Sequence, residues 1–293
     1  HAALVAEAWK LFQESYSNFP INLTFTHYGP LHHAVVWPLY LFPVDRPIAP
    51  SWKFTFPLES GDRIGECVCF DHTLAEALIL LERMARLWDE GVTIFEKIEG
   101  CFAADAGRML DIGLAKALGV QIRSAFNTFR FYALREDLPY GDALAQRAAL
   151  AAMREIVRDE IENCARLSAL CARDSRLGFH SEAEGYKYFP AKLDWRAGLL
   201  EGLLSVDFPT LSAQIERGEP LFPEYTGDSP EGPVYRCPRD RGSASRQKLD
   251  GIETAWLAFH DPDAVTFEIE CSTPVAGTQA PGDQVILEIE PCR

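Results

Sequence analysis

Apolar residues at helical spacing, extending with short interruptions over residues 73–173, constrain the fold of this chain more than any other feature. Thr73 and Glu76 have the spacing of a capping box, and the apolar stripe that follows continues to Ile98. Two further stripes cover residues 104–136 and 142–173. Because short connections between long helices make neighbours antiparallel, the sequence predicts a helical bundle.

A fourth helix is predicted after Pro190, since proline suits the first turn of a helix and apolar residues continue towards Ile215. The segment between Asp174 and Pro190, "DSRLGFHSEAEGYKYFP", concentrates polar and aromatic residues. We interpret it as mainly a structured corner, with Asp174 and Arg176 holding the helix end and Gly178 supplying a turn. Its aromatic residues Tyr186, Tyr188 and Phe189 are expected to pack.

The two ends of the chain differ from this helical centre. Residues 2–16 predict a helix, and "INLTFTHY" predicts a buried strand that stops at Gly29 and Pro30, which together resemble one unit of an α/β fold. The six prolines between positions 30 and 57 argue against helix there and predict a long ordered loop. Near the other end, "AWLAFH", "AVTFEIEC" and "DQVILEIEP" predict antiparallel strands.

We therefore expect a mainly α fold: the last helix-strand unit of an α/β barrel, then a long-helix bundle, then an antiparallel β-sandwich segment. The expected boundaries are 1–70 for the barrel end and its proline-rich loop, 71–218 for the bundle, 219–233 for a linker and 234–293 for a partial β-sandwich. The opening residues look like the middle of a helix, so we expect the chain to be a piece of a longer polypeptide.

Composition excludes some classes of partner. The net charge of -15 disfavours nucleic acid and anionic membrane surfaces. No run of 18 apolar residues is present, so we expect no membrane span. The eight cysteines lack zinc-finger spacing, and we expect reduced, buried thiols with neither metal nor cofactor. Nothing in the sequence assigns a compartment.

Four stretches resemble a known group: "GPLHHAVVWPLYLFPVDRPIAPSW", "SGDRIGEC", "ALGVQIRSAFNTFRFYALRE" and the corner segment. They are similar to the carboxy-terminal part of bacterial glycoside hydrolase-like proteins, in which a (β/α)8 barrel precedes a helical domain. Some members continue into a sandwich similar to family 9 carbohydrate-binding modules. The resemblance implies that residues 1–28 end the barrel, that residues 29–70 leave its active face and that residues 240–293 begin a sugar-binding sandwich. It supplies no catalytic residues.

On this interpretation a set of polar and aromatic residues lines a sugar-binding cleft. The residues expected to contact substrate are His27, Tyr28, Trp37, Tyr40, Asp45, Arg46, His180, Glu182 and Tyr186. Imidazole can bind a sugar hydroxyl, and a flat aromatic ring can cover the apolar face of a pyranose. Packing is an equal alternative for Trp37 and the favoured one for Tyr40, and Asp45 and Arg46 form either a local ion pair or a polar clamp.

Two other polar patterns each have a functional and a non-functional explanation. Glu182 and Glu184, if extended, would lie about 7 Å apart, within the range that glycoside hydrolysis requires, but they fall outside the barrel part of the chain. Arg123, Asn127 and Arg130 share one face of the second long helix, and solvent is the usual explanation for such a face.

The leading hypothesis is the carboxy-terminal part of a glycoside hydrolase-like protein, inactive alone, with carbohydrate as its partner. The alternative is a non-catalytic helical scaffold or dimerisation module, forming a homodimer through the bundle, with a glycan-binding β-domain. A weaker third hypothesis is a metal-dependent hydrolase built on His27, His32 and His33.

Overall fold

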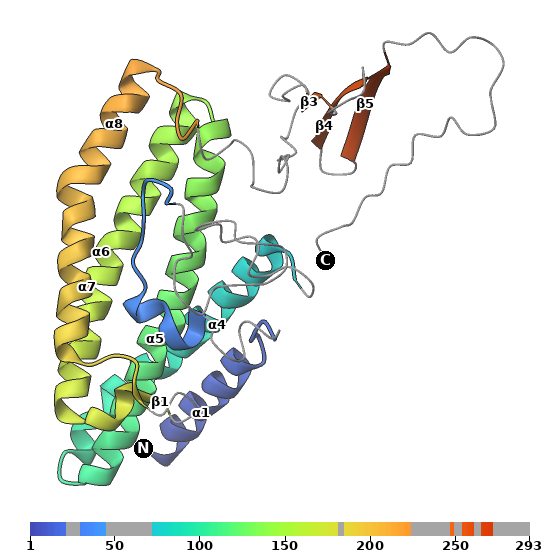
Figure 1. The fold of residues 1–293 in the computed structure, drawn as a ribbon. Coiled ribbons are helices and arrows are strands. Elements are labelled where there is room, and N and C mark those ends of the chain that lie inside the picture. The colour runs from blue at the N-terminus through green and yellow to red at the C-terminus, as the bar shows by residue number, and fades with distance from the viewer. Residues whose placement is uncertain are drawn as a thin grey trace. The chain divides into compact units, whose positions relative to one another are not determined.

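The structure is a computed structural model that describes residues 1–21, 30–44, 72–180 and 185–223, together with the strands at 247–248, 254–260 and 265–271. It divides into two units, His1–Tyr225 and Thr226–Pro291. The first unit is helical and the second contains strands (Figure 1). The change of unit lies within the segment 219–233 that the sequence assigned to a linker.

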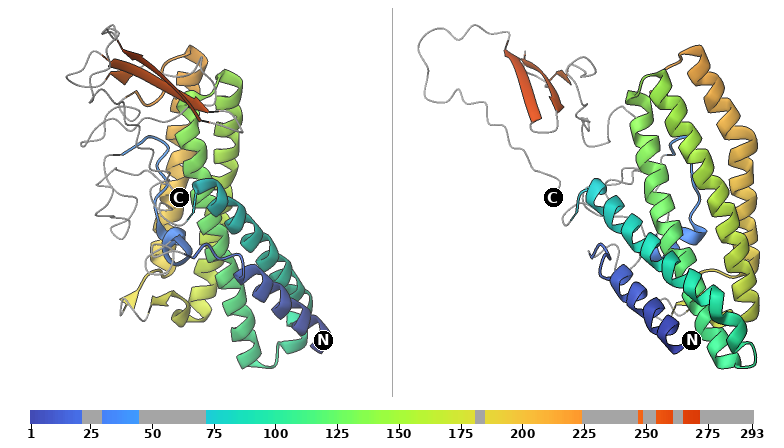
Figure 2. Two further views of the ribbon diagram at one scale, coloured as in Figure 1. Left: turned by 90° about the vertical axis from the view of Figure 1, so that its right-hand side faces the viewer. Right: turned by 180° about the vertical axis from the view of Figure 1, so that it is seen from behind.

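Long helices dominate the first unit, as the apolar stripes predicted. They are α1 (Ala2–Tyr16), α4 (Leu74–Ile98), α5 (Ala106–Asp137), α6 (Ala143–Arg173), α7 (Pro190–Gly202) and α8 (Phe208–Arg217). The figures show α5, α6 and α7 running side by side, with α1 beside α4 (Figures 1 and 2). The mainly helical fold is thus confirmed.

The helix starts follow from capping side chains. Thr73 accepts a hydrogen bond from the Glu76 backbone N–H, and the Glu76 carboxylate accepts one from the Thr73 backbone, which completes the predicted capping box. These hydrogen bonds lower the pKa of Glu76. Asp105 and Asp142 cap α5 and α6 in the same way, by accepting from backbone N–H groups three residues ahead.

Aromatic packing joins α1 to α4. The ring of Phe12 lies 4.5 Å from Trp88 and 5.3 Å from Phe95, measured between ring centroids. Gly91 makes this possible, because a Cβ at that position would lie 2.4 Å from the Phe12 ring. Trp88 in turn donates its indole N–H to the carbonyl of Ala115 in α5, at 2.8 Å, so α1, α4 and α5 share one core.

The proline-rich loop differs from its prediction. The segment Pro30–His33 forms a short helix, α3, and Ala34–Val36 forms a 3-10 turn, where the prolines had argued against helix. The reason is that Pro30 opens the helix, at a position where a missing N–H costs nothing. Most described residues from 31 to 41 are buried, so this stretch is part of the core.

The fourth predicted helix is interrupted. Between α7 and α8, residues Leu203–Asp207 form a π-helical turn. Pro209 follows in the first turn of α8, where its ring has no N–H to continue the α-helical ladder from α7. The helix ends at Gly218, whose φ of 67° lies in the left-handed region that glycine favours.

The second unit contains one antiparallel sheet in its described part, in the order β3 (Gln247–Lys248), β4 (Thr254–His260), β5 (Val265–Cys271). Strand β4 contains the predicted segment "AWLAFH", and β5 covers the predicted segment "AVTFEIEC" except its first residue. A sandwich requires a second packed sheet, and the residues described in this unit do not include one.

Candidate functional site

The corner that follows α6 is held by an aspartate and an arginine, as predicted. Asp174 ends α6, and its backbone N–H donates to Leu170. Its carboxylate accepts hydrogen bonds from the backbone N–H, Nε and Nη2 of Arg176, at 3.1, 2.8 and 2.8 Å. These hydrogen bonds lower the pKa of Asp174, so it is an ionised acceptor at neutral pH.

A two-stranded hairpin follows, formed by β1 (Phe179–His180) and β2 (Gly185–Tyr186). Gly178 is needed at its base because of a close approach: a Cβ there would lie 1.9 Å from the carbonyl oxygen of Tyr188. Tyr188 is buried, as expected, and its hydroxyl donates to Leu177 at 2.6 Å and accepts from Gln121. Burial raises the pKa of this phenol. The hairpin is therefore anchored to α5.

Two aromatic rings stand out from the hairpin. Phe179 and Tyr186 are cross-strand partners, about half exposed at 51% and 52%, with ring centroids 5.6 Å apart and an edge-to-face angle of 76°. The expectation that Tyr186 and Phe189 pack inside is wrong, since Phe189 is also 45% exposed. Cross-strand partners share one face of a hairpin, and here that face is open to solvent.

A groove of about 460 Å³ runs beside this hairpin, and we call it the hairpin groove. Leucines of α5 form an apolar side, and the corner provides polar groups. Its lining residues are Leu110, Asp111, Leu114, Leu118, Gln121, Asp174, Arg176, Leu177, Gly178, Phe179, His180, Lys187 and Tyr188. The predicted contact residue His180 lines this groove, and Tyr186 stands across the hairpin from Phe179, which also lines it.

Two other predicted contacts lie in the core or against it. Trp37 is only 3% exposed, and its carbonyl accepts from Arg196 Nε at 2.8 Å. The backbone of Tyr40 donates to the hydroxyl of Tyr132 at 3.1 Å and accepts from Arg135 at 2.9 Å. These contacts hold the loop against α5 and α7, which favours the packing alternative for both aromatics.

The remaining predicted contacts are not placed. His27, Tyr28, Asp45, Arg46 and Glu182 lie outside the described residues. Glu184 and the side chain of His32 lie outside them too. Across the residues that are described, no group of three or more His, Cys, Asp or Glu side chains could hold a metal ion.

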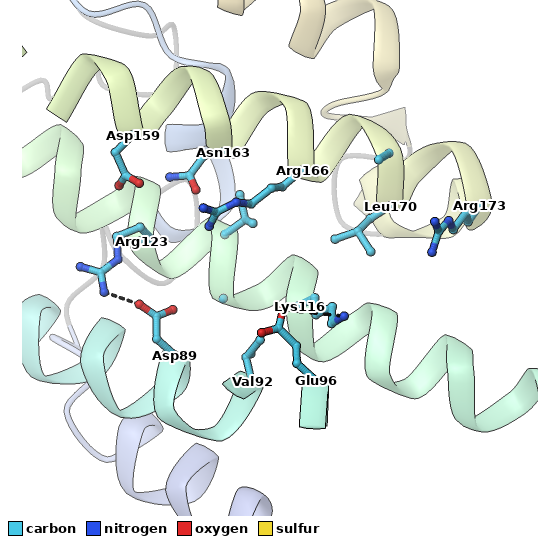
Figure 3. A pocket seen from close by; sticks show the side chains of 13 residues that line it. Asp89, Val92, Glu96, Lys116, Arg123, Asp159, Asn163, Arg166, Leu170 and Arg173 are labelled. Atoms are coloured by element: carbon cyan, nitrogen blue, oxygen red, sulfur yellow. Dashed lines mark hydrogen bonds and ion pairs between the residues drawn. The ribbon is translucent and has the colours of Figure 1, made fainter. Parts of the chain in front are cut away.

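The sequence did not predict a second groove, which lies between α4, α5 and α6 and has a volume of about 660 Å³ (Figure 3). We call it the interhelical groove. Apolar and charged side chains both line it. The lining residues are Asp89, Val92, Glu96, Lys116, Gly119, Val120, Arg123, Asp159, Asn163, Arg166, Ala169, Leu170 and Arg173.

A buried polar network lies behind this groove. The Glu160 Oε1 atom accepts hydrogen bonds from Ser124 at 3.0 Å and from the Nδ2 atoms of Asn127 and Asn163 at 2.8 Å. Glu160 and Arg196 are both fully buried, and their ion pair measures 2.7 Å. The solvent explanation for the polar face of α5 is therefore wrong at Asn127, which is 4% exposed.

At the groove itself the same face of α5 bears an ion pair, between Arg123 and Asp89 of α4 (Figure 3). Asn127 also donates to Asp159 at 2.7 Å. Burial raises the pKa of Asp159, and the nearby charge of Glu160 adds to the rise. The missed signal was the combination of Asn127 in α5 with the Asp159-Glu160 pair in α6, two polar sets on facing helices.

Comparison with known proteins finds no matching family model, no matching curated protein and no matching solved structure. Across residues 1–21, 30–44, 72–180 and 185–223, no helix has the length and apolar character needed to cross a bilayer.

Proposed function

We propose that the helical unit binds carbohydrate at the hairpin groove, as the binding part of a glycoside hydrolase-like protein. The observation that carries this proposal is the half-exposed pair Phe179 and Tyr186 beside a groove with one apolar side and polar groups from the corner. Exposed rings on a hairpin offer an apolar surface to the C–H face of a sugar. The proposal is consistent with the resemblance of the chain to glycosidase-like proteins.

The polar groups beside the rings suit hydroxyl groups. Asp174 is an ionised acceptor, and Arg176 uses Nε and Nη2 on it, which leaves Nη1 for a ligand. His180 and Lys187 line the same groove and add further hydrogen-bonding groups. Adjacent donors and acceptors match the adjacent hydroxyls of a sugar, each of which both donates and accepts.

We further propose that the β-unit is a partial carbohydrate-binding sandwich, an assignment that rests on the resemblance alone.

The hairpin groove has two carboxylates in its lining, Asp174 and Asp111. Asp174 is engaged by Arg176 in three hydrogen bonds, which suits an acceptor better than a general acid. The proposal for the helical unit is therefore binding, with no catalytic step assigned to it.

The test is a glycan array probed with the intact chain, followed by calorimetry on the best neutral oligosaccharide. The double variant Phe179→Ala/Tyr186→Ala is expected to bind about tenfold more weakly or worse, because central aromatic contacts dominate binding energy. Trp195→Ala is the matched control, since Trp195 is a 54% exposed aromatic outside the groove lining.

Either of two results would overturn the proposal. One is a folded wild-type chain that binds no glycan on the array, with folding verified by circular dichroism. The other is a double variant that keeps wild-type affinity while Trp195→Ala also keeps it, which would place glycan binding elsewhere on the chain.

A further inference from the structure

The interhelical groove contains a buried hydrogen-bond acceptor without a partner. Asn163 is 1% exposed and lines the groove. Its Nδ2 donates to Glu160, which fixes the orientation of the amide. The Oδ1 atom has no hydrogen-bond partner among the described residues, and Figure 3 shows it turned into the groove. A buried acceptor is costly to leave unpaired, so the site is built to receive a donor.

Charged side chains of both signs surround this acceptor. Lining cations number four and lining carboxylates three: Lys116, Arg123, Arg166 and Arg173 against Asp89, Glu96 and Asp159. Each of the carboxylates has a partner, which is Arg123 for Asp89, Lys116 for Glu96 at 3.8 Å and Asn127 for Asp159. Lys116 also pairs with Glu99, which lies outside the lining, at 2.6 Å, so Lys116 and Arg123 are both engaged by carboxylates.

Two of the cations are available to a ligand. Arg173 has no ion pair within the described part of the chain, and Arg166 pairs only with Glu162, outside the lining, at 3.1 Å. Both members of that pair are well exposed, at 62% and 67%, so the pair is weak and easily exchanged. Arg166 lies three residues after Asn163 on α6, which places the two on one face about 5 Å apart along the axis.

We propose that the interhelical groove binds a small hydroxylated carboxylate. Its hydroxyl donates to Asn163 Oδ1, and its carboxylate is held by Arg166, with Arg173 as a second cation of the lining. Apolar lining residues such as Val120 and Leu170 contact the carbon chain. Arginine suits this role because its planar fork matches the geometry of a carboxylate.

The experiment is isothermal titration calorimetry of the intact chain with three probes at low ionic strength. D-gluconate carries both hydroxyls and a carboxylate, sorbitol carries the hydroxyls without the charge, and acetate carries the charge without the hydroxyls. Gluconate is expected to bind at least about tenfold more tightly than either of the others, because only it satisfies both groups.

Substitutions on α6 test whether gluconate binds in the interhelical groove. Arg166→Gln is expected to weaken gluconate binding about tenfold and to bring its affinity close to that of sorbitol. Because Arg166 is exposed, Arg166→Gln should fold. Asn163→Ala is a less suitable test, since it disturbs the hydrogen bonds to Glu160 and can prevent folding. Arg158→Gln is the matched control, since Arg158 lies on the same helix in a similarly exposed ion pair, with Glu155.

Three results would overturn the inference. They are no heat of binding with gluconate at 10 mM (roughly the weakest binding that such a titration detects), equal binding of sorbitol, and unchanged gluconate binding in Arg166→Gln. The inference does not rest on the proposed carbohydrate function. Loss of glycan binding in Phe179→Ala/Tyr186→Ala leaves gluconate binding intact, so failure of one site is distinguishable from failure of the other.

Discussion

Arg196 of α7 and Glu160 of α6 form an ion pair, 2.7 Å between Nη2 and Oε2, although neither side chain is exposed to solvent. Arg196 also donates from Nε to the carbonyl of Trp37 and from Nη1 to the sulfur of Cys164, at 3.4 Å. One guanidinium therefore links α6, α7 and the loop after α3. The cost of desolvating both charges offsets much of their attraction, so the ion pair adds little net stability. Its main effect is to fix how these three segments contact one another.

Arg196→Met is expected to lower the free energy of unfolding by about 3–5 kcal/mol, because it leaves the charge of Glu160 buried without a counter-ion. Adding Glu160→Gln should recover part of the loss. The amide removes the charge and keeps an oxygen that accepts from Ser124, Asn127 and Asn163. Urea unfolding of the two single variants and the double variant completes the cycle. The charge argument would be contradicted if Glu160→Gln destabilised the wild type and the Arg196→Met variant equally.

The helices could be predicted from the sequence because their signals are local. The apolar stripe predicted the third long helix over 142–173, and the structure has Ala143–Arg173. The buried network could not be predicted, because its contacts join residues far apart in the chain. Arg196 and Trp37 are 159 positions apart. Periodicity shows which face of a helix is apolar, but it does not give the register between two helices.

In the candidate sites too, features set by neighbouring residues could be predicted and features set by distant contacts could not. The corner at Asp174 and Arg176 was predicted because capping and turn residues act on their near neighbours. Tyr186 was expected both to pack and to contact substrate, and the sequence could not decide between them, since an aromatic residue has the same composition signal whether it packs or stands exposed. Asn163 was missed because its role depends on Glu160 fixing its amide, a contact visible only with the network in place.

Gly178→Ala is expected to destabilise the helical unit by about 1–3 kcal/mol, as overpacking does, since the new Cβ would meet the Tyr188 carbonyl oxygen at 1.9 Å. Backbone must move to relieve that contact, which disturbs the hydrogen bond from the Tyr188 hydroxyl to Leu177. Gly198→Ala is the control: nothing lies within 4 Å of its Cβ position, inside α7. It should stabilise by about 0.5–1 kcal/mol. Equal effects of the two changes on the urea midpoint would contradict this prediction.

Alkylation with iodoacetamide at pH 8 is expected to modify Cys101 well before Cys164 and Cys171. Cys101 is exposed and the other two are buried. Burial raises the pKa of Cys171 to about 11 and also raises that of Cys164. About one Cys171 thiol in a thousand is then the reactive thiolate at this pH. Peptide mapping by mass spectrometry measures each site, and labelling in urea shows the rates without burial. Native Cys171 reacting as fast as Cys101 would sink the prediction.

Asp159→Asn is expected to raise the stability of the chain at pH 7. Burial raises the folded pKa of Asp159, with a further contribution from Glu160, so ionisation of this carboxyl opposes folding. The stability that Asp159 contributes is fully present below its unfolded pKa of about 3.9 and is lost as pH rises through the folded value. Asparagine keeps an oxygen that accepts from Asn127, as Asp159 Oδ2 does at 2.7 Å.

The pH dependence of that difference is the decisive measurement. The free energy of unfolding of Asp159→Asn and of the wild type is compared by urea titration from pH 3.5 upward to pH 8, a span of roughly four units around the unfolded pKa. The advantage of the variant should be largest at neutral pH and should shrink as the pH falls towards the unfolded pKa, because the wild-type carboxyl is then protonated. A wild type that is more stable than the variant at pH 7 would show that attraction to Arg123 and Arg166 outweighs burial at this position.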